Sequence, residues 1–157
     1  MKALIAYDSV SSEKNTRKVA EALRDALRLR GVEADSLHAD EVDAQRVAGY
    51  DCLVVGSPTM AWRPTPPVVA LLDRLAQSPA KGGSAAAFDT RVKSILSGGA
   101  AGQIEGRLSK LGFKIAAPAT AFYVKGGSTQ SGGNFKLVDG ELEKATEFAA
   151  KLATSMA

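Results

Sequence analysis

Cysteine, histidine and aromatic residues are scarce in this sequence. Among its 157 residues there is one cysteine, Cys52, and one histidine, His38, and 6% of the residues are aromatic. A single cysteine excludes an internal disulfide and a thiolate metal cluster, and it favours a reducing, cytoplasmic setting. With so few ligands and bases, we predict neither a metal site nor a catalytic triad. We expect Cys52 to be an inert thiol inside a strand, and His38 to lie on the surface, away from any functional loop.

Long apolar runs and long blocks of like charge are also missing. No segment approaches the roughly 18 apolar residues that a membrane span requires, so no membrane insertion is expected. The apolar stretch at residues 1–10 has no basic region before it and no small-residue cleavage site, which favours a first strand over a signal peptide. The net charge is +3, without aromatic residues interleaved among the basic ones, so nucleic-acid binding is not expected.

Strand-like and helix-like patterns alternate along the chain. Short apolar runs predict five strands, at residues 3–7, 32–38, 52–56, 84–88 and 115–124, the last interrupted by Pro118. Helical spacing of apolar residues predicts helices at 16–30, 42–47, 66–77, 100–111 and 140–155. Parallel neighbours need crossover connections, so the alternation predicts an α/β fold with a doubly wound five-stranded parallel sheet, in a single domain spanning residues 1–157.

Three segments of such a sheet are candidates for a binding site. In open α/β sheets, ligands bind beyond the carboxyl ends of the strands, near the point where strand order reverses. That rule selects the segments after the first, third and fourth strands, which are residues 8–16, 57–65 and 89–99.

The first segment is rich in small hydroxyl and amide side chains. It contains Ser9, Ser11, Ser12, Asn15 and Thr16 and runs directly into a predicted helix. Free N–H groups and the positive end of the helix dipole attract an anion there, which favours a phosphate site. The same side chains also serve as ordinary helix caps, and both interpretations stay open at this point. The loop has no glycine, so it is neither a dinucleotide fingerprint nor a P-loop.

The second segment presents the chain's one tryptophan. In GSPTMAWRPTPP, four prolines stiffen a loop that carries Trp62. A rigid loop that exposes an indole at the edge of the sheet is suited to stacking on a flat ring system. The alternative is that Trp62 folds back onto the domain or fills a protein interface.

These residues resemble the flavodoxin family. YDSVSSEKNTRKVAEAL is similar to its first strand, phosphate loop and first helix, and YDCLVVGSPTMAWRPTPPVVALL to its third strand and flavin loop. AAAFDTR and SGGAAGQIEGRLSKLGF resemble its fourth strand, second flavin loop and following helix. In the first loop, SSEK replaces the glycine of the family pattern. The resemblance implies a flavodoxin-like three-layer α/β/α sandwich that binds FMN noncovalently and shuttles electrons between protein partners.

The resemblance also assigns site residues. It implies that the phosphate is held by Ser9, Ser11, Ser12, Asn15 and Thr16. It implies contacts to the flavin ring from Pro58, Thr59, Met60, Ala61, Trp62, Asp89, Thr90, Arg91 and Gly98.

Three functions remain as hypotheses. The favoured one is an FMN-binding electron carrier, a cytoplasmic monomer with an unidentified redox partner protein. The second is an NAD(P)H-dependent flavin or quinone reductase on the same fold; such enzymes are usually oligomeric, and the polar loop at residues 125–133 does not suggest an insertion for assembly. The third is a domain that has lost FMN through its altered first loop and serves binding or regulation.

Overall fold

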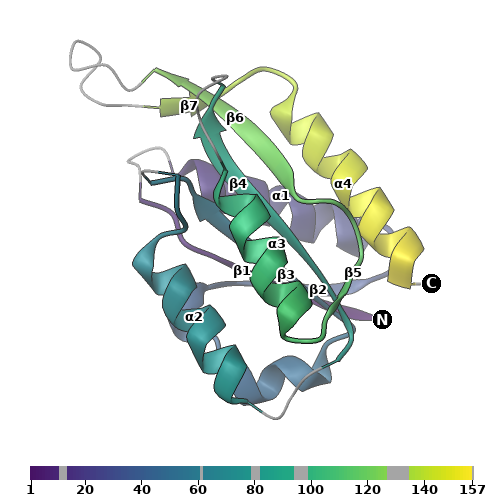
Figure 1. The fold of residues 1–157 in the computed structure, drawn as a ribbon. Coiled ribbons are helices and arrows are strands. Elements are labelled where there is room, and N and C mark those ends of the chain that lie inside the picture. Colours follow the sequence, from purple (N-terminus) through teal and green to yellow (C-terminus); the bar gives the residue numbers. More distant parts are fainter. Residues whose placement is uncertain (11–13, 61, 79–81, 94–98, 127–134, 157) are drawn as a thin grey trace.

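One sheet runs through the computed structural model, which describes residues 1–10, 14–60, 62–78, 82–93, 99–126 and 135–156. Its strands follow the order β2-β1-β3-β4-β6-β7, and β5 pairs with β4 (Figure 1). All pairs are parallel except β6 with β7, which is antiparallel. The strands are β1 (Lys2–Tyr7), β2 (Glu33–His38), β3 (Cys52–Pro58), β4 (Ser84–Val92), β5 (Lys114–Ile115), β6 (Thr120–Gly126) and β7 (Phe135–Leu137).

Helices cover both faces of this sheet, as the sequence predicts. α1 (Asn15–Leu29) and α4 (Glu141–Met156) pack on one face, and α2 (Pro66–Gln77) and α3 (Ala100–Lys110) pack on the other (Figure 1). Two 3-10 turns, η1 (Ala39–Glu41) and η2 (Ala44–Gly49), extend the second layer. The arrangement is the expected three-layer α/β/α sandwich. Among the described residues, no helix combines the length and the hydropathy that crossing a membrane demands.

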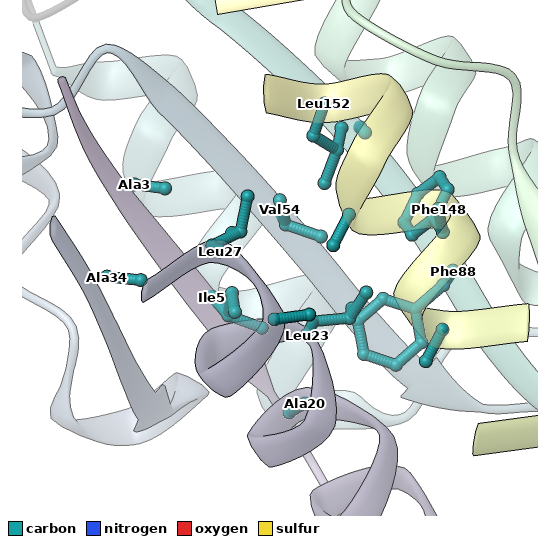
Figure 2. Packing of buried hydrophobic residues seen from close by; sticks show 14 of the residues in the cluster. Ala3, Ile5, Ala20, Leu23, Leu27, Ala34, Val54, Phe88, Phe148 and Leu152 are labelled. Atoms are coloured by element: carbon teal, nitrogen blue, oxygen red, sulfur yellow. The ribbon is translucent and has the colours of Figure 1, made fainter. Parts of the chain in front are cut away.

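The central strands are buried because both of their faces carry apolar side chains. On the side of α1 and α4, Ile5 and Val54 pack against Leu23 and Leu27, and Phe88 fills the space beside them (Figure 2). β4 otherwise contributes only alanines to the two cores, at positions 85–87. These small side chains allow the helices on both faces to pack close to β4. The ring of Phe88 then fills the remaining space at one end of the core between the sheet and the layer of α1 and α4.

Five details differ from the predicted elements. The predicted strand at 115–124 divides at Pro118, which has no N–H to donate to a ladder, into β5 and β6. β7 adds an unpredicted antiparallel edge strand. The predicted short helix at 42–47 is the 3-10 turn η2. β3 and β4 run further than expected, because their parallel pairing continues to the partners Pro58 and Thr90. Of the predicted loop at 125–133, residues 125–126 belong to β6 and the rest lies outside the described residues.

Candidate functional site

A cavity of about 310 Å³ opens at the carboxyl ends of β1, β3, β4 and β6. It receives side chains from all three predicted segments. Its lining residues are Val10, Asn15, Thr16, Pro58, Thr59, Met60, Thr90, Arg91, Val92, Val124 and Phe135. A concave, mostly apolar surface with a few convergent polar groups is the usual form of a small-molecule site.

The beginning of α1 joins the first segment to the far side of the cavity. Asn15 and Thr16 are both buried, although they are polar. The Thr16 hydroxyl lies 2.8 Å from the hydroxyl of Thr90, and Asn15 Nδ2 donates to the carbonyl of Phe135 at 2.9 Å. Asn15 Oδ1 is buried without a partner among the described atoms, so it remains available as an acceptor beside the cavity. Ser9 Oγ accepts the N–H of Arg17 at 3.4 Å and partly caps the helix.

Ser11 and Ser12 lie outside the described residues, together with Ala61 and Gly98. Their assignment to the site therefore stays a prediction. Of the remaining predicted positions, Ser9, Trp62 and Asp89 do not line the cavity, and the others do.

Lys14 has a left-handed backbone immediately before α1, with φ 52° and ψ 46°. This conformation places the Cβ of an L-residue too close to the following carbonyl and costs roughly 1–2 kcal/mol. A lysine therefore occupies a position at which glycine would be unstrained.

We expect Lys14→Gly to be more stable than Lys14→Ala by about 1 kcal/mol, because only glycine relieves the left-handed strain. Both substitutions remove the same charged side chain, so the comparison isolates the backbone. Urea unfolding of the two variants measures the difference. Equal midpoints at equal slopes would show that the backbone at Lys14 is not strained.

The second segment forms a tight, rigid turn. The Ser57 hydroxyl accepts the N–H of Thr65 at 3.0 Å and holds the two ends of the segment together. Within it, Met60 and Arg63 exchange two backbone hydrogen bonds of 2.9 Å. Trp62 sits in the turn between them with φ 67°. A tryptophan in the left-handed region is rare, and such strain persists where the surrounding structure enforces it.

Trp62 points its indole outward. The side chain is 59% exposed, so it does not fold back into the core of the domain. Its carbonyl accepts a hydrogen bond from the side-chain amide of Gln103, which ties the turn to α3. Met60, two residues earlier, lines the cavity. Trp62 is thus an exposed aromatic side chain on a fixed turn, two residues after the cavity residue Met60.

The third segment differs from the prediction because Asp89, Thr90 and Arg91 are strand residues. At the end of β4, Thr90 and Arg91 line the cavity, whereas the carboxylate of Asp89 is fully buried. Asp89 Oδ2 accepts the N–H of Ala101 at 2.9 Å, at the first turn of α3, and Oδ1 lies 3.5 Å from Arg91 Nε. Asp89 therefore holds the N-terminus of α3 rather than facing a ligand.

Gly99 is required by the same arrangement, and sequence reasoning did not identify it. A Cβ built on Gly99 would lie 2.2 Å from Arg91 Nη1 and 2.6 Å from Asp89 Oδ2. Only a residue without a side chain lets the start of α3 approach the buried ion pair. Val124 and Phe135 of the lining were also not predicted, because the rule of strand ends considered only the segments after strands one, three and four.

Burial raises the pKa of Asp89 above its ordinary 3.8, and the hydrogen bond from Ala101 and the charge of Arg91 offset only part of this rise. The folded state therefore holds the proton more tightly than the unfolded chain does. The contribution of Asp89 to the free energy of unfolding is therefore largest at low pH. It falls as the pH rises from the ordinary pKa of the carboxyl group toward the raised pKa of the folded state.

We expect the stability of the native protein relative to Asp89→Asn to fall as pH rises from about 4 to 7, because only the native side chain must ionise in the interior. Urea unfolding of both proteins across this range measures the difference. A relative stability that increases with pH would show that ionised Asp89 is favoured in the folded state.

His38 contradicts the prediction that it lies away from the loops. Its Nε2 lies 2.8 Å from Asp8 Oδ1, at the beginning of the first segment. Nδ1 accepts the N–H of Asp40, so the ring proton is on Nε2 and is donated to Asp8. The parallel register pairs Tyr7 with His38 and brings these strand ends together. Cys52 is buried as expected, and burial raises the pKa of its thiol to about 12.

Comparison with known proteins agrees with this geometry. The flavodoxin family profile matches residues 5–148. A flavodoxin from the domain Archaea superposes with a TM-score of 0.80 at 21% identity, covering 99% of both chains. Oxidised flavodoxin 1 from Bacillus cereus superposes with a TM-score of 0.81 at 18% identity, covering 98% of both chains. Oxidised flavodoxin 2 from the same organism superposes with a TM-score of 0.80 at 23% identity, covering 98% of this chain and 99% of that chain. These identities support the fold. No curated protein matches the sequence.

Proposed function

The chain belongs to the flavodoxin family, and on that basis we propose that it binds one FMN at the carboxyl edge of the sheet and carries electrons between protein partners. The observation that supports this most strongly is the single cavity into which all three predicted segments contribute side chains. The free thiol of Cys52 fits a carrier that works in a reducing, cytoplasmic setting.

The cavity suits a flavin in shape and polarity. Its volume of about 310 Å³ is within the range of roughly 300–1,000 Å³ typical of small-molecule sites. Val10, Pro58, Met60 and Val92 supply flat apolar contact. The unpartnered Asn15 Oδ1 supplies a buried acceptor. The cavity therefore combines apolar surface for the flavin ring with a buried polar atom for a polar substituent.

We assign the phosphate to the first segment and the beginning of α1. The hydroxyls of Ser9, Ser11, Ser12 and Thr16, and the N–H of the Asn15 amide that is not donated to Phe135, are donors of the kind that a phosphate requires. The N–H groups of the first turn of α1, of which that of Arg17 is donated to Ser9 Oγ, add a positive potential. Lys14, immediately before α1, adds a positive charge beside the same turn.

We assign the ring to the second and third segments. Trp62 covers one face of the ring and excludes water from it, and Thr59, Thr90 and Arg91 supply polar groups for the ring edge. The contacts of Ala61 and Gly98, which lie outside the described residues, are those that the family resemblance implies. Arg91 lines the cavity and favours negative charge on a bound group. A bound flavin supplies the electron-transfer chemistry, and the protein supplies binding, orientation and local charge.

The visible absorption spectrum of the purified protein tests this function. We expect the bands of a bound flavin at about one equivalent per chain. Oxidation of NAD(P)H with a quinone as acceptor should then be absent, which separates the carrier from a reductase. A protein that lacks these bands and fails to take up added FMN would support the alternative of a domain that has lost its cofactor.

We expect Trp62→Ala to weaken FMN binding by about tenfold, or roughly 1.4 kcal/mol, because it removes the stacked ring. Fluorescence titration of the apoproteins measures this. Trp62→Phe is the matched control and should stay within about threefold of the native affinity. Since the side chain is exposed, urea unfolding of the alanine variant should show no loss of stability. Unchanged affinity for FMN in Trp62→Ala would exclude the stacking role.

A further inference from the structure

The first segment begins with a buried carboxylate. Asp8 is 5% exposed, and its N–H donates to the carbonyl of Gly56 at 3.2 Å, which continues the contact of β1 with β3 by one residue. A buried carboxylate is unfavourable unless another group donates a hydrogen bond to it or pairs with its charge. The same segment is assigned to a phosphate, which a nearby negative charge repels. Asp8 therefore requires a partner that stabilises its charge and fixes its position.

His38, at the end of β2, is this partner. Its Nε2–H donates to Asp8 Oδ1 at 2.8 Å. The imidazole is itself held by its neighbours. Tyr7, its register partner in β1, packs edge-on against it with the ring centres 6.1 Å apart, and its Nδ1 accepts the N–H of Asp40 at 3.1 Å. The donor that restrains Asp8 is thus fixed by β1 and by the turn η1.

The beginning of α1 has no carboxylate cap. Lys14, the residue before the helix, makes no side-chain cap hydrogen bond, and the first turn contains no acidic residue. Carboxylates are favoured at such a position, because the helix dipole and the free N–H groups attract negative charge. By sequence, residues 8–16 contain two carboxylates, Asp8 and Glu13, of which Glu13 lies outside the described residues. A phosphate can occupy this position only if these carboxylates do not.

The chain brings Asp8 near the beginning of α1. Ser9, the next residue, accepts the N–H of Arg17 through its Oγ at 3.4 Å, and its carbonyl oxygen lies 3.4 Å from Lys14 Nζ. The helix start therefore contacts the direct neighbour of Asp8. Without the bond to His38, the carboxylate of Asp8 would be attracted to the same N–H groups and to Lys14, and it would compete with a phosphate.

We propose that His38 is a positioning residue for phosphate binding. By holding the carboxylate of Asp8 at the end of β2, it keeps this charge away from the N–H groups at the beginning of α1 and leaves them to the phosphate of the flavin. This rests on the proposed function, because it concerns the phosphate end of the same site. His38 acts only through Asp8, so its effect should fall on the phosphate alone and should depend on the charge of Asp8.

Fluorescence titration of the apoproteins with FMN and with riboflavin tests this role. We expect His38→Leu to weaken FMN binding by about tenfold and to leave riboflavin binding within about twofold of the native value, since riboflavin has no phosphate. Unchanged riboflavin binding also shows that the variant is folded. His38→Gln keeps an N–H donor at about the reach of Nε2, so it should bind FMN within about threefold of the native affinity. Equal losses for both flavins, or no rescue by glutamine, would overturn the proposal.

Asp8→Asn removes the charge and keeps an oxygen that accepts from His38. We expect this variant to bind FMN at least as tightly as the native protein. Adding His38→Leu to Asp8→Asn should then change the FMN affinity by less than about twofold, because no carboxylate is left to restrain. A loss of FMN affinity in Asp8→Asn as large as that in His38→Leu would overturn the proposal, because the carboxylate itself would then serve the ligand.

Tyr50→Phe is the matched control. The hydroxyl of Tyr50 donates to Asp35 Oδ2 at 2.9 Å, which is another side-chain hydrogen bond to a carboxylate next to β1. Tyr50 lies just before β3, at the opposite end of the sheet from the cavity. Tyr50→Phe should therefore leave the binding of both flavins within about twofold. A loss of preference for FMN equal to that of His38→Leu would show that the effect does not arise at Asp8.

The native protein separates this proposal from the proposed function. A native apoprotein that binds FMN, together with a His38→Leu variant that keeps the full preference for FMN over riboflavin, would retain the carrier and reject the role of His38. A native apoprotein that binds neither flavin would reject the carrier and the role of His38 together.

Discussion

Replacing Gly56 with alanine is expected to destabilise the protein by about 3 kcal/mol. Gly56 is paired with Phe88 across β3 and β4, and a Cβ at this position would lie 2.0 Å from the ring of Phe88. The ring cannot yield easily, because it is fully buried and packs edge-on against Phe122. Forcing an extra carbon into such a core typically costs 1–3 kcal/mol, and occasionally more. Urea unfolding measures the loss.

Gly106→Ala is the matched control. Gly106 lies within α3, and a Cβ there meets no atom within 4 Å. The substitution should stabilise the protein by about 0.5–1 kcal/mol, because alanine is the better helix former. We also expect Gly56→Ala to weaken FMN binding, since displacement of Phe88 shifts Thr90 and Arg91 in the same strand. A Gly56→Ala protein as stable as the native one would show that Phe88 does not pack over Gly56.

Riboflavin, which lacks the phosphate, is expected to bind the apoprotein about 100-fold more weakly than FMN, a difference of roughly 2.7 kcal/mol. The reason is that hydrogen bonds to a charged phosphate are about twice as strong as neutral ones, and several donors gather at the beginning of α1. Fluorescence titration with each flavin gives the ratio of the two dissociation constants.

Two variants show which segment holds which part of the flavin. Ser9→Ala removes a hydroxyl of the first segment, so it should weaken the binding of FMN alone and lower the ratio of the riboflavin dissociation constant to the FMN dissociation constant. Trp62→Ala removes a ring contact, so it should weaken the binding of both flavins and leave this ratio unchanged. Equal affinities of the native apoprotein for the two flavins would exclude the phosphate assignment to the first segment.

The alternation of strands and helices and the three layers could be predicted from the sequence, because the individual elements depend on local patterns. The continuous apolar runs of β1 and β3 and the helical spacing in α1 each indicate an element without any knowledge of its neighbours. β7 has no such pattern. Its three residues, Phe135–Leu137, form a strand only because the edge of β6 offers them unpaired backbone groups.

The polar ends of β3 and β4 show a related limit. Ser57, Asp89 and Thr90 have the composition of loop residues, and the prediction placed them in loops. In the structure the two strands continue to pair, and the side chains of Ser57, Asp89 and Thr90 hydrogen-bond to Thr65, Ala101 and Thr16, respectively. Tertiary hydrogen bonds of this kind leave no trace in local composition.

The three segments selected by the rule that ligands bind at the strand ends meet at one cavity, and the assignment of their residues to a flavin stays a prediction. The contact between Asp8 and His38 depends on the register of β1 with β2, and the need for glycine at Gly99 depends on the buried pair of Asp89 and Arg91. Neither register nor burial is written in the sequence near those residues.

The central claim is that three separate segments form one slot for a phosphate-bearing flavin. Titration of FMN into the apoprotein, followed by the emission of the flavin, tests it most directly. We predict quenching that is linear up to one equivalent of FMN at micromolar protein and then stops. Flavin emission that stays unquenched by the apoprotein at that concentration would contradict the claim.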